Sequence, residues 1–163
     1  MRSDPGDPPE DAIREILAWL HQAAPDRLLL VCPPDSALRR AVDQAHGAAE
    51  HLAPDAATPA ALDGHAYDLA VVAGTLECLT SADAGKLLSR LRDLHTKRFL
   101  ALVRLTPDGW SNTDLIAYGM KRCGRFEDGY ALYRFNIYDY KDTPDWLNAR
   151  YWAHPERWGK ERW

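Results

Sequence analysis

Three uninterrupted apolar runs alternate along the chain with stretches in which apolar residues recur at helical spacing. Runs without polar alternation are typical of strands that are buried on both faces of a sheet. A weaker strand is predicted at Ala48–Leu52, and Ala53–Gly64, rich in alanine, proline and aspartate, is predicted to be a loop. The three buried strands are predicted at Arg27–Cys32, Tyr67–Ala73 and Arg98–Leu105.

Apolar periodicity and capping residues predict four helices. Each begins at a residue whose side chain can accept a backbone hydrogen bond, and three of them carry an acidic residue three positions later, as in a capping box. The spacing also predicts that Ala45 in the second helix and Leu94 in the third face inward. The predicted helices are Asp7–Ala24, Asp35–His46, Thr80–Thr96 and Ser111–Cys123, and the acids of the capping boxes are Glu10, Asp83 and Asp114.

The end of this alternating region predicts an antiparallel hairpin. Asp128-Gly129 is a turn signal, and it would join a short strand at Arg125–Glu127 to a long strand at Tyr130–Tyr138. Helices that alternate with buried strands indicate an α/β fold with a mostly parallel sheet between two layers of helices. The predicted architecture is therefore a three-layer sandwich with an antiparallel C-terminal hairpin.

Composition narrows the class of protein. The chain has 163 residues, of which 46% are hydrophobic, so it can bury one substantial core. Its net charge of −4 argues against general nucleic-acid binding, which needs a basic face. Three widely spaced cysteines argue against a disulfide framework and favour a reducing cytoplasm. No apolar run reaches the ~20 residues of a membrane span, and the acidic, proline-rich start differs from a signal peptide.

The stretch DLAVVAGTLECL, Asp68–Leu79, resembles the fourth strand and following loop of S-adenosylmethionine-dependent methyltransferases with a Rossmann-like sheet. Members of that family often have a Leu-Glu-His-Leu turn here, and Cys78 takes the place of the histidine. The resemblance extends over Arg27–Tyr138, and it implies a Rossmann-like fold with a cofactor crevice at the carboxyl ends of the strands. The whole chain, with its tryptophan-rich tail, also resembles a small uncharacterised bacterial group of such proteins.

The resemblance implies a crevice whose chemistry is altered. The family's glycine-rich turn is replaced by Cys32-Pro33-Pro34-Asp35, and proline has no N–H to donate to a cofactor. Glu50 would be the ribose-holding acid, and Asp63 lies near the place of the adenine-contacting acid. The short stretch Gly47–Ala66 leaves the family's third strand reduced or absent. The crevice residues implied are Cys32, Pro33, Asp35, Glu50, Asp63, Thr75, Leu76 and Glu77.

Other chemistry-bearing residues have plain structural interpretations. Cys32 and Cys78 end neighbouring predicted strands, so they are a candidate redox pair, a nucleophile or half a metal site, but small buried residues filling the core are the favoured interpretation. No spacing supports a metal site. Glu77 is either a ligand contact or a loop cap, Asp35 is explained by helix capping, and His65 and His95 are predicted to be solvated.

The last segment differs from the rest. Residues 1–142 are predicted to form the methyltransferase-like domain, and 143–163 an arm that interleaves aromatic and basic residues. Tryptophan, tyrosine and arginine dominate interface hot spots, so the Trp146–Trp163 part is predicted either to pack on the domain or to bind a protein partner, including a second copy of the chain. Nucleic-acid binding is the weakest alternative.

Three functions follow from these patterns. The favoured hypothesis is a degenerate methyltransferase-like domain that has lost normal S-adenosylmethionine binding and acts as a binding or scaffold module, with no cofactor. The alternative is an active small-molecule methyltransferase that uses S-adenosylmethionine through an atypical loop, with catalytic groups from Glu77, Asp68 or Thr106–Asn112. The third is an adaptor that binds a partner through the tryptophan-rich tail.

Overall fold

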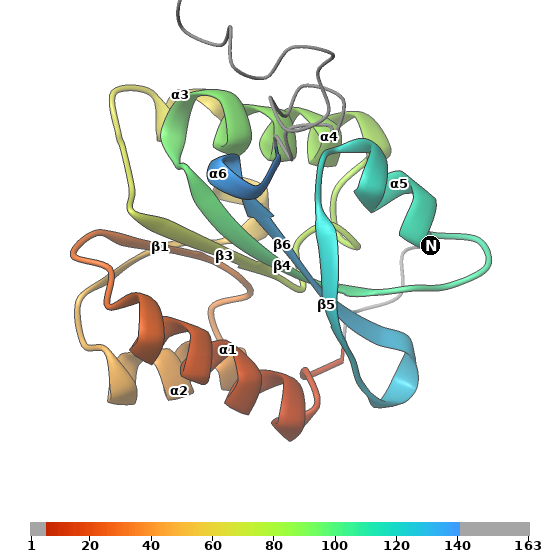
Figure 1. Ribbon diagram of the computed structural model, residues 1–163, viewed down its shortest axis with the longest axis horizontal. Helices are drawn as coiled ribbons and strands as arrows, with labels where there is room; N and C mark the ends of the chain where they lie inside the picture. The colour runs from red at the N-terminus through yellow and green to blue at the C-terminus, as the bar shows by residue number, and fades with distance from the viewer. Residues whose placement is uncertain (1–5, 141–163) are drawn as a thin grey trace, which may run out of the picture.

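The computed structural model describes residues 6–140, which form a three-layer α/β sandwich (Figure 1). Within this range, six strands lie in the order β2-β1-β3-β4-β6-β5. The strands from β2 to β4 pair in parallel, and β6 pairs antiparallel with both β4 and β5. The predicted fold class is confirmed. The strands are β1 (Leu28–Val31), β2 (Ala49–Leu52), β3 (Leu69–Ala73), β4 (Arg98–Arg104), β5 (Lys121–Arg125) and β6 (Tyr130–Asn136).

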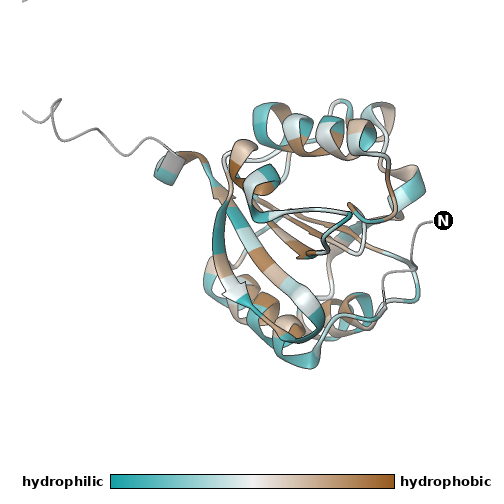
Figure 2. Ribbon diagram, turned by 90° about the vertical axis from the view of Figure 1, so that its right-hand side faces the viewer, coloured by the Kyte–Doolittle hydropathy of each residue, from teal (hydrophilic) through white to brown (hydrophobic). Residues whose placement is uncertain are grey.

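The helices cover both faces of the sheet. Helices α1 and α2 lie below it in the view of Figure 1, and α3, α4 and α5 lie above. Hydropathy colouring shows the apolar strands enclosed between these two helical layers (Figure 2). The helices are α1 (Glu10–Ala23), α2 (Ala37–Ala45), α3 (Pro59–Leu62), α4 (Ser81–Arg90), α5 (Asn112–Ala117) and α6 (Ile137–Tyr140), with short helical turns η1 (Pro54–Ala56), η2 (Leu91–His95) and η3 (Glu127–Gly129).

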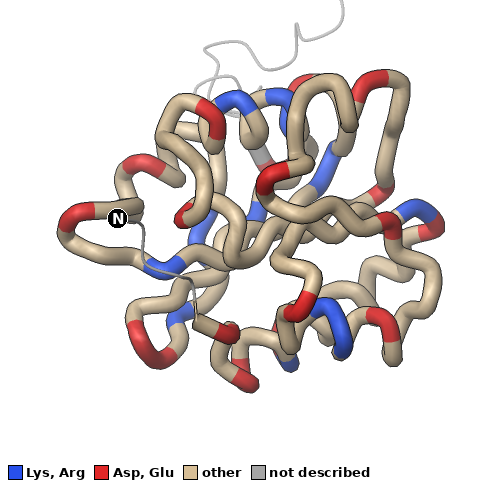
Figure 3. Tube along the Cα trace, turned by 180° about the vertical axis from the view of Figure 1, so that it is seen from behind, with Lys and Arg blue, Asp and Glu red and all other residues tan. Residues whose placement is uncertain are grey.

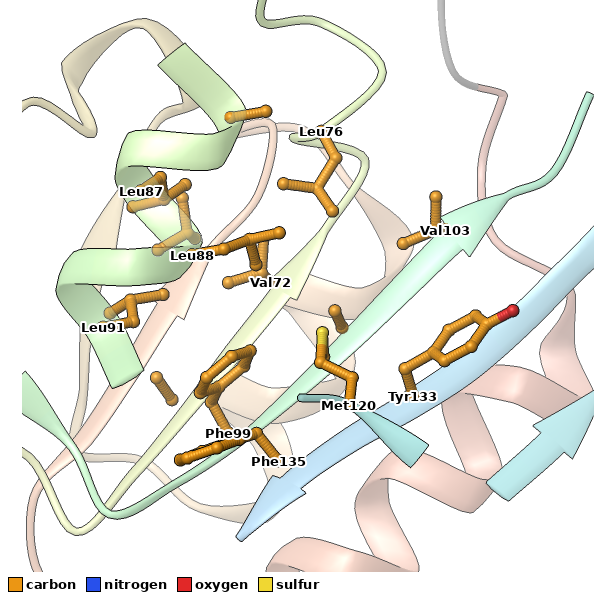
Figure 4. Close-up of a cluster of buried hydrophobic side chains, with 14 of the residues drawn as sticks. Val72, Leu76, Leu87, Leu88, Leu91, Phe99, Val103, Met120, Tyr133 and Phe135 are labelled. Atoms are coloured by element: carbon orange, nitrogen blue, oxygen red, sulfur yellow. The ribbon is translucent and has the colours of Figure 1, made fainter. Parts of the chain in front are cut away.

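Alternation along the central strands divides the core in two. In β3, Val71 faces the cluster of α1 and α2, while its neighbours Ala70 and Val72 face the cluster of α4. Figure 4 shows the second cluster, in which Leu88 of α4 lies over the strands. Burial on both faces explains why these strands are continuous apolar runs, as predicted.

Two predicted helix caps are wrong. The cap position of α1 is Pro9, without a side-chain cap, and the Asp7 carboxylate instead accepts a hydrogen bond from the Ala37 amide at the start of α2. The cap of α2 is Ser36, whose Oγ accepts from the Leu38 amide, rather than Asp35. The predicted caps Thr80 of α4 and Ser111 of α5 are confirmed.

The third predicted helix stays helical to His95, close to its predicted end at Thr96, whereas the fourth predicted helix is too long. Helix α4 gives way to a π-helical turn at Leu91, so the helical phase changes, and Leu94, predicted to face inward, is 64% exposed. Helix α5 ends at Ala117, and Gly119 adopts φ = 85°, a conformation that glycine tolerates best. The chain then enters β5, part of which had been predicted as helix.

Smaller differences concern loops and strand ends. The predicted loop at Ala53–Gly64 contains η1 and α3, because Pro54 and Pro59 each begin a helical turn. The predicted inward residue Ala45 is exposed. The hairpin at Asp128-Gly129 is confirmed, with positive φ at both residues, but its first strand is β5 rather than Arg125–Glu127, and its second ends at Asn136 instead of Tyr138.

The outer surface of the described part carries mixed charge. Acidic and basic residues interleave along the trace in Figure 3. Across residues 6–140, no helix combines the length and apolarity needed to cross a membrane.

On the β2 side of the sheet, β2 pairs with β1 alone among the described strands, in keeping with the reduced third strand that the resemblance implies.

The core predicts a clear contrast between two leucines of neighbouring turns. Leu88→Ala should lower the free energy of unfolding by about 2–5 kcal/mol, because Leu88 is 1% exposed and its removal leaves a cavity. Leu94→Ala, the matched control at a 64% exposed position, should change it by about 0.5 kcal/mol or less. Urea denaturation measures both, and equal effects would contradict the observed helical phase.

Candidate functional site

The carboxyl ends of the parallel strands meet at one edge of the sheet and border a pocket of about 220 Å³. In open α/β sheets, ligands bind at this edge. The walls come from three parts of the chain: the turn after β1, the end of β3, and the segment before α1. The lining residues are Gly6, Asp7, Pro8, Pro33, Asp35, Ser36, Ala73 and Gly74.

The turn after β1 bonds its donors within the chain. The Ser36 amide donates to the Pro33 carbonyl at 3.1 Å, and the Leu38 amide donates to Ser36 Oγ at 3.2 Å. Pro33 and Pro34 have no N–H. The start of α2 therefore offers few backbone donors to a ligand.

Residues Gly6–Pro8, here called the N-terminal arm, form one wall of the pocket. Asp7 Oδ1 accepts from the Ala37 amide at 3.1 Å, and the Gly6 carbonyl accepts from the Tyr130 hydroxyl at 2.8 Å. A helix N-terminus favours negative charge, so α2 stabilises the Asp7 carboxylate. The arm thus connects the first helix to both the turn after β1 and the start of β6.

The predicted residues Thr75 and Leu76 hold the loop after β3 in place. The buried Thr75 hydroxyl donates to the Val31 carbonyl at 2.9 Å, which links the ends of β3 and β1. The Leu76 side chain is buried in the core, and its carbonyl accepts from Trp110 Nε1 at 3.0 Å. Both side chains therefore support the edge of the sheet rather than line the pocket described above.

Glu77 is the most unusual acid at this edge. Its Oε1 accepts from the Arg104 amide at 2.6 Å, and its Oε2 is buried without a hydrogen-bond partner among the residues described. Burial raises the pKa of this carboxyl above its ordinary value of 4.5, although the backbone hydrogen bonds and the Arg104 charge lower it. Glu77 clamps the loop to β4 and retains one oxygen for a further contact.

Two predicted acids lie away from the pocket. Glu50 stands in the middle of β2, opposite Leu29, and its carboxylate accepts from the Tyr67 hydroxyl at 2.8 Å. Asp63 follows α3 and pairs with Arg90, the last residue of α4. The structure brings Pro33 and Asp35 together with the end of β3, but it does not bring Glu50 or Asp63 to them.

Cys32 is 2% exposed and lies in the core cluster of α1 and α2. Burial raises the pKa of its thiol to about 11, which keeps it protonated and unreactive. Cys78 is half-buried, and its Sγ donates to the Gly74 carbonyl. In residues 6–140 no group of three potential metal ligands comes together. The core-filling interpretation fits Cys32.

Two further assignments change with the structure. His95, predicted to be solvated, is 5% exposed, and its Nδ1 bonds the carbonyl of His65, which is itself exposed. Asp68 precedes β3 at the amino edge of the sheet, where its carboxylate accepts from the Arg27 amide. It lies at the opposite end of the strand from the pocket.

Ser36, Tyr130 and the N-terminal arm belong to this site, although none of them was predicted there from the sequence. Ser36 had a detectable signal, because serine is a good helix cap. Tyr130 and Gly6 are 124 positions apart, and nothing in the local sequence marks their contact.

Glu77→Gln provides a pH test of this site. Because the folded protein holds the Glu77 proton to a higher pH than the unfolded chain does, wild-type stability falls as pH rises above about 4.5 through the folded pKa. Glutamine keeps an oxygen for the Arg104 amide and removes this titration. Urea denaturation at several pH values from 4.5 to 8 should show the variant gaining stability relative to wild type as pH rises. A difference that stays constant with pH would contradict the assignment.

Solved structures of methyltransferases share the fold. An O-methyltransferase family protein from Burkholderia thailandensis is 12% identical with a TM-score of 0.53, and the match covers 77% of this chain and 55%, about half, of that protein. A methyltransferase from Geobacter sulfurreducens is 13% identical with a TM-score of 0.52, covering 80% of each chain. The methyltransferase domain of bacterial CtHen1 is 11% identical with a TM-score of 0.54, covering 78% of this chain and 98% of that domain.

At these identities the likeness establishes the fold alone. The comparison with curated proteins finds no match. A family model covers residues 8–163, nearly the whole chain. The chain therefore belongs to DUF6231, a family of unknown function, and has a methyltransferase-like fold.

Proposed function

We propose that this chain is a degenerate methyltransferase-like domain that does not bind S-adenosylmethionine in the ordinary way and acts as a binding or scaffold module. The observation that carries the proposal is the internal bonding of the turn after β1. The amides of Ser36, Ala37 and Leu38 donate respectively to a carbonyl, a carboxylate and a hydroxyl of the same chain. Backbone amides that are already bonded offer little to a cofactor.

The positions of the acids support the same proposal. A nucleoside ligand in a Rossmann-like sheet needs an acid near the end of the second strand to bond the ribose hydroxyls. In this chain, β2 ends at Leu52, while Glu50 bonds Tyr67. A cofactor in the pocket would lack that contact.

The size of the pocket points in the same direction. Its volume of about 220 Å³ is below the roughly 300–1,000 Å³ that is usual for small-molecule sites. The N-terminal arm occupies part of the crevice edge. A nucleoside cofactor would need the arm to move.

One observation favours the alternative, an active methyltransferase with an atypical loop. Glu77 lies at the edge where the reacting groups of such enzymes meet, and its buried Oε2 has no hydrogen-bond partner within residues 6–140. A buried acid of raised pKa is a candidate general base. Binding of S-adenosylmethionine by the wild-type chain distinguishes the two functions, because only the active methyltransferase requires it.

Calorimetric titration of the full chain with S-adenosylmethionine and S-adenosylhomocysteine should give no saturable heat. In thermal unfolding, a ligand present at 100 times its Kd would add about 2.7 kcal/mol, or roughly 5–10 °C, so the expected absence of a shift is measurable. A saturable isotherm would overturn the proposal. In that case Glu50→Gln decides whether Glu50 contacts the ribose of the cofactor. If it does, the variant binds the cofactor more weakly. If Glu50 bonds only Tyr67, cofactor binding stays unchanged.

The partner-binding part of the proposal concerns the tryptophan-rich tail, residues 143–163, which lies outside the described residues. We propose that it binds a protein partner or a second copy of the chain. Deletion of Thr143–Trp163 should leave a cooperative thermal transition while abolishing self-association in sedimentation velocity, or partner capture by full-length chain. A deletion that unfolds the domain would assign the segment a structural role instead.

A further inference from the structure

Two hydrogen bonds hold the N-terminal arm at the crevice. Its Gly6 and Asp7 are exposed and Pro8 is half-buried, so the arm adds little to the apolar core. The two core clusters begin at Leu29 and at Ala12, both beyond the arm. Segments with few buried apolar contacts open at low free-energy cost.

Two hydrogen bonds from different elements fasten the arm. The Ala37 amide, at the start of α2, donates to the Asp7 carboxylate at 3.1 Å. The Tyr130 hydroxyl, at the start of β6, donates to the Gly6 carbonyl at 2.8 Å. These donors come from separate parts of the fold, because α2 follows β1 whereas β6 lies beyond β4 in the sheet.

The arm also closes the pocket physically. Gly6, Asp7 and Pro8 line it together with Ser36 and Gly74, which belong to the crevice itself. Ser36 is 6% exposed. Departure of the arm would remove one wall of the pocket and open Ser36 and Gly74 to solvent.

We propose that Gly6–Pro8 is a strap that closes the crevice and opens when its two anchors, Asp7 to Ala37 and Gly6 to Tyr130, are released. In the closed state, the Asp7 carboxylate is the acceptor for the Ala37 amide at the start of α2. A ligand that displaces the strap must supply acceptors to the same two donors, an anionic group for the amide and a carbonyl or similar oxygen for the hydroxyl. This inference goes beyond the proposed function and does not depend on whether a cofactor binds.

The strap is tested without a ligand by solvent paramagnetic relaxation in the full-length protein. A soluble gadolinium chelate should relax the amide protons of Ser36 and Gly74 several-fold faster in Asp7→Ala than in wild type. Exchange of the Ala37 amide should accelerate about tenfold or more, since a hydrogen bond to a charged acceptor is lost. Tyr130→Phe, which keeps the buried ring and removes only the hydroxyl, should give a smaller change in the same direction.

Asp11→Ala is the matched control. It removes another exposed acid from the same region, but Asp11 pairs with Arg14 on the surface of α1, so the pocket amides should behave as in wild type. Unchanged relaxation of Ser36 and Gly74 in both Asp7→Ala and Tyr130→Phe would overturn the strap. A change in the Asp11 variant equal to that in the Asp7 variant would also overturn it. Cofactor titration plays no part in this readout, so the two proposals fail separately.

Discussion

The structure depends on the burial of its central strands on both faces. Strands β1, β3 and β4 alternate their side chains between two separate cores, so each strand is pinned by α1 and α2 on one side and by α4 on the other. Parallel strands held in this way end at a common edge, and their connections must begin there. This constraint sets the positions of the pocket, the turn after β1 and the loop that carries Glu77.

At that edge the chain bonds many of its polar groups to itself. The Thr75 hydroxyl ties β3 to β1, Glu77 ties the loop to β4, and Asp7 ties the arm to α2. Buried polar groups need partners, and in a ligand-binding site some of those partners come from the ligand. Here the chain provides most of them, whereas the Glu77 Oε2 is buried at this edge without a hydrogen-bond partner among the described residues.

A methyltransferase-like fold does not by itself establish methyl transfer, because folds host many functions and the site decides. The similarity to solved methyltransferases at 11–13% identity reflects the arrangement of strands and helices. The DUF6231 model covers residues 8–163, so it includes the tryptophan-rich tail as well as the domain. Function must therefore be argued from the prolines after β1, the position of Glu50 and the arm over the crevice.

The sequence alone determined the features that depend on local patterns. Continuous apolar runs predicted the buried strands, Ser111 with Asp114 predicted the start of α5, and Asp128-Gly129 predicted the hairpin, because burial period, capping and turn geometry act over a few residues. Only the tertiary structure decided which distant partner a polar side chain takes and where the helical phase changes. Asp7 bonds Ala37, Glu50 bonds Tyr67, and Leu94 faces solvent after a π-helical turn. Such contacts join residues far apart in the sequence or follow a shift in helical phase, and they are set by how the layers pack, which no local pattern encodes.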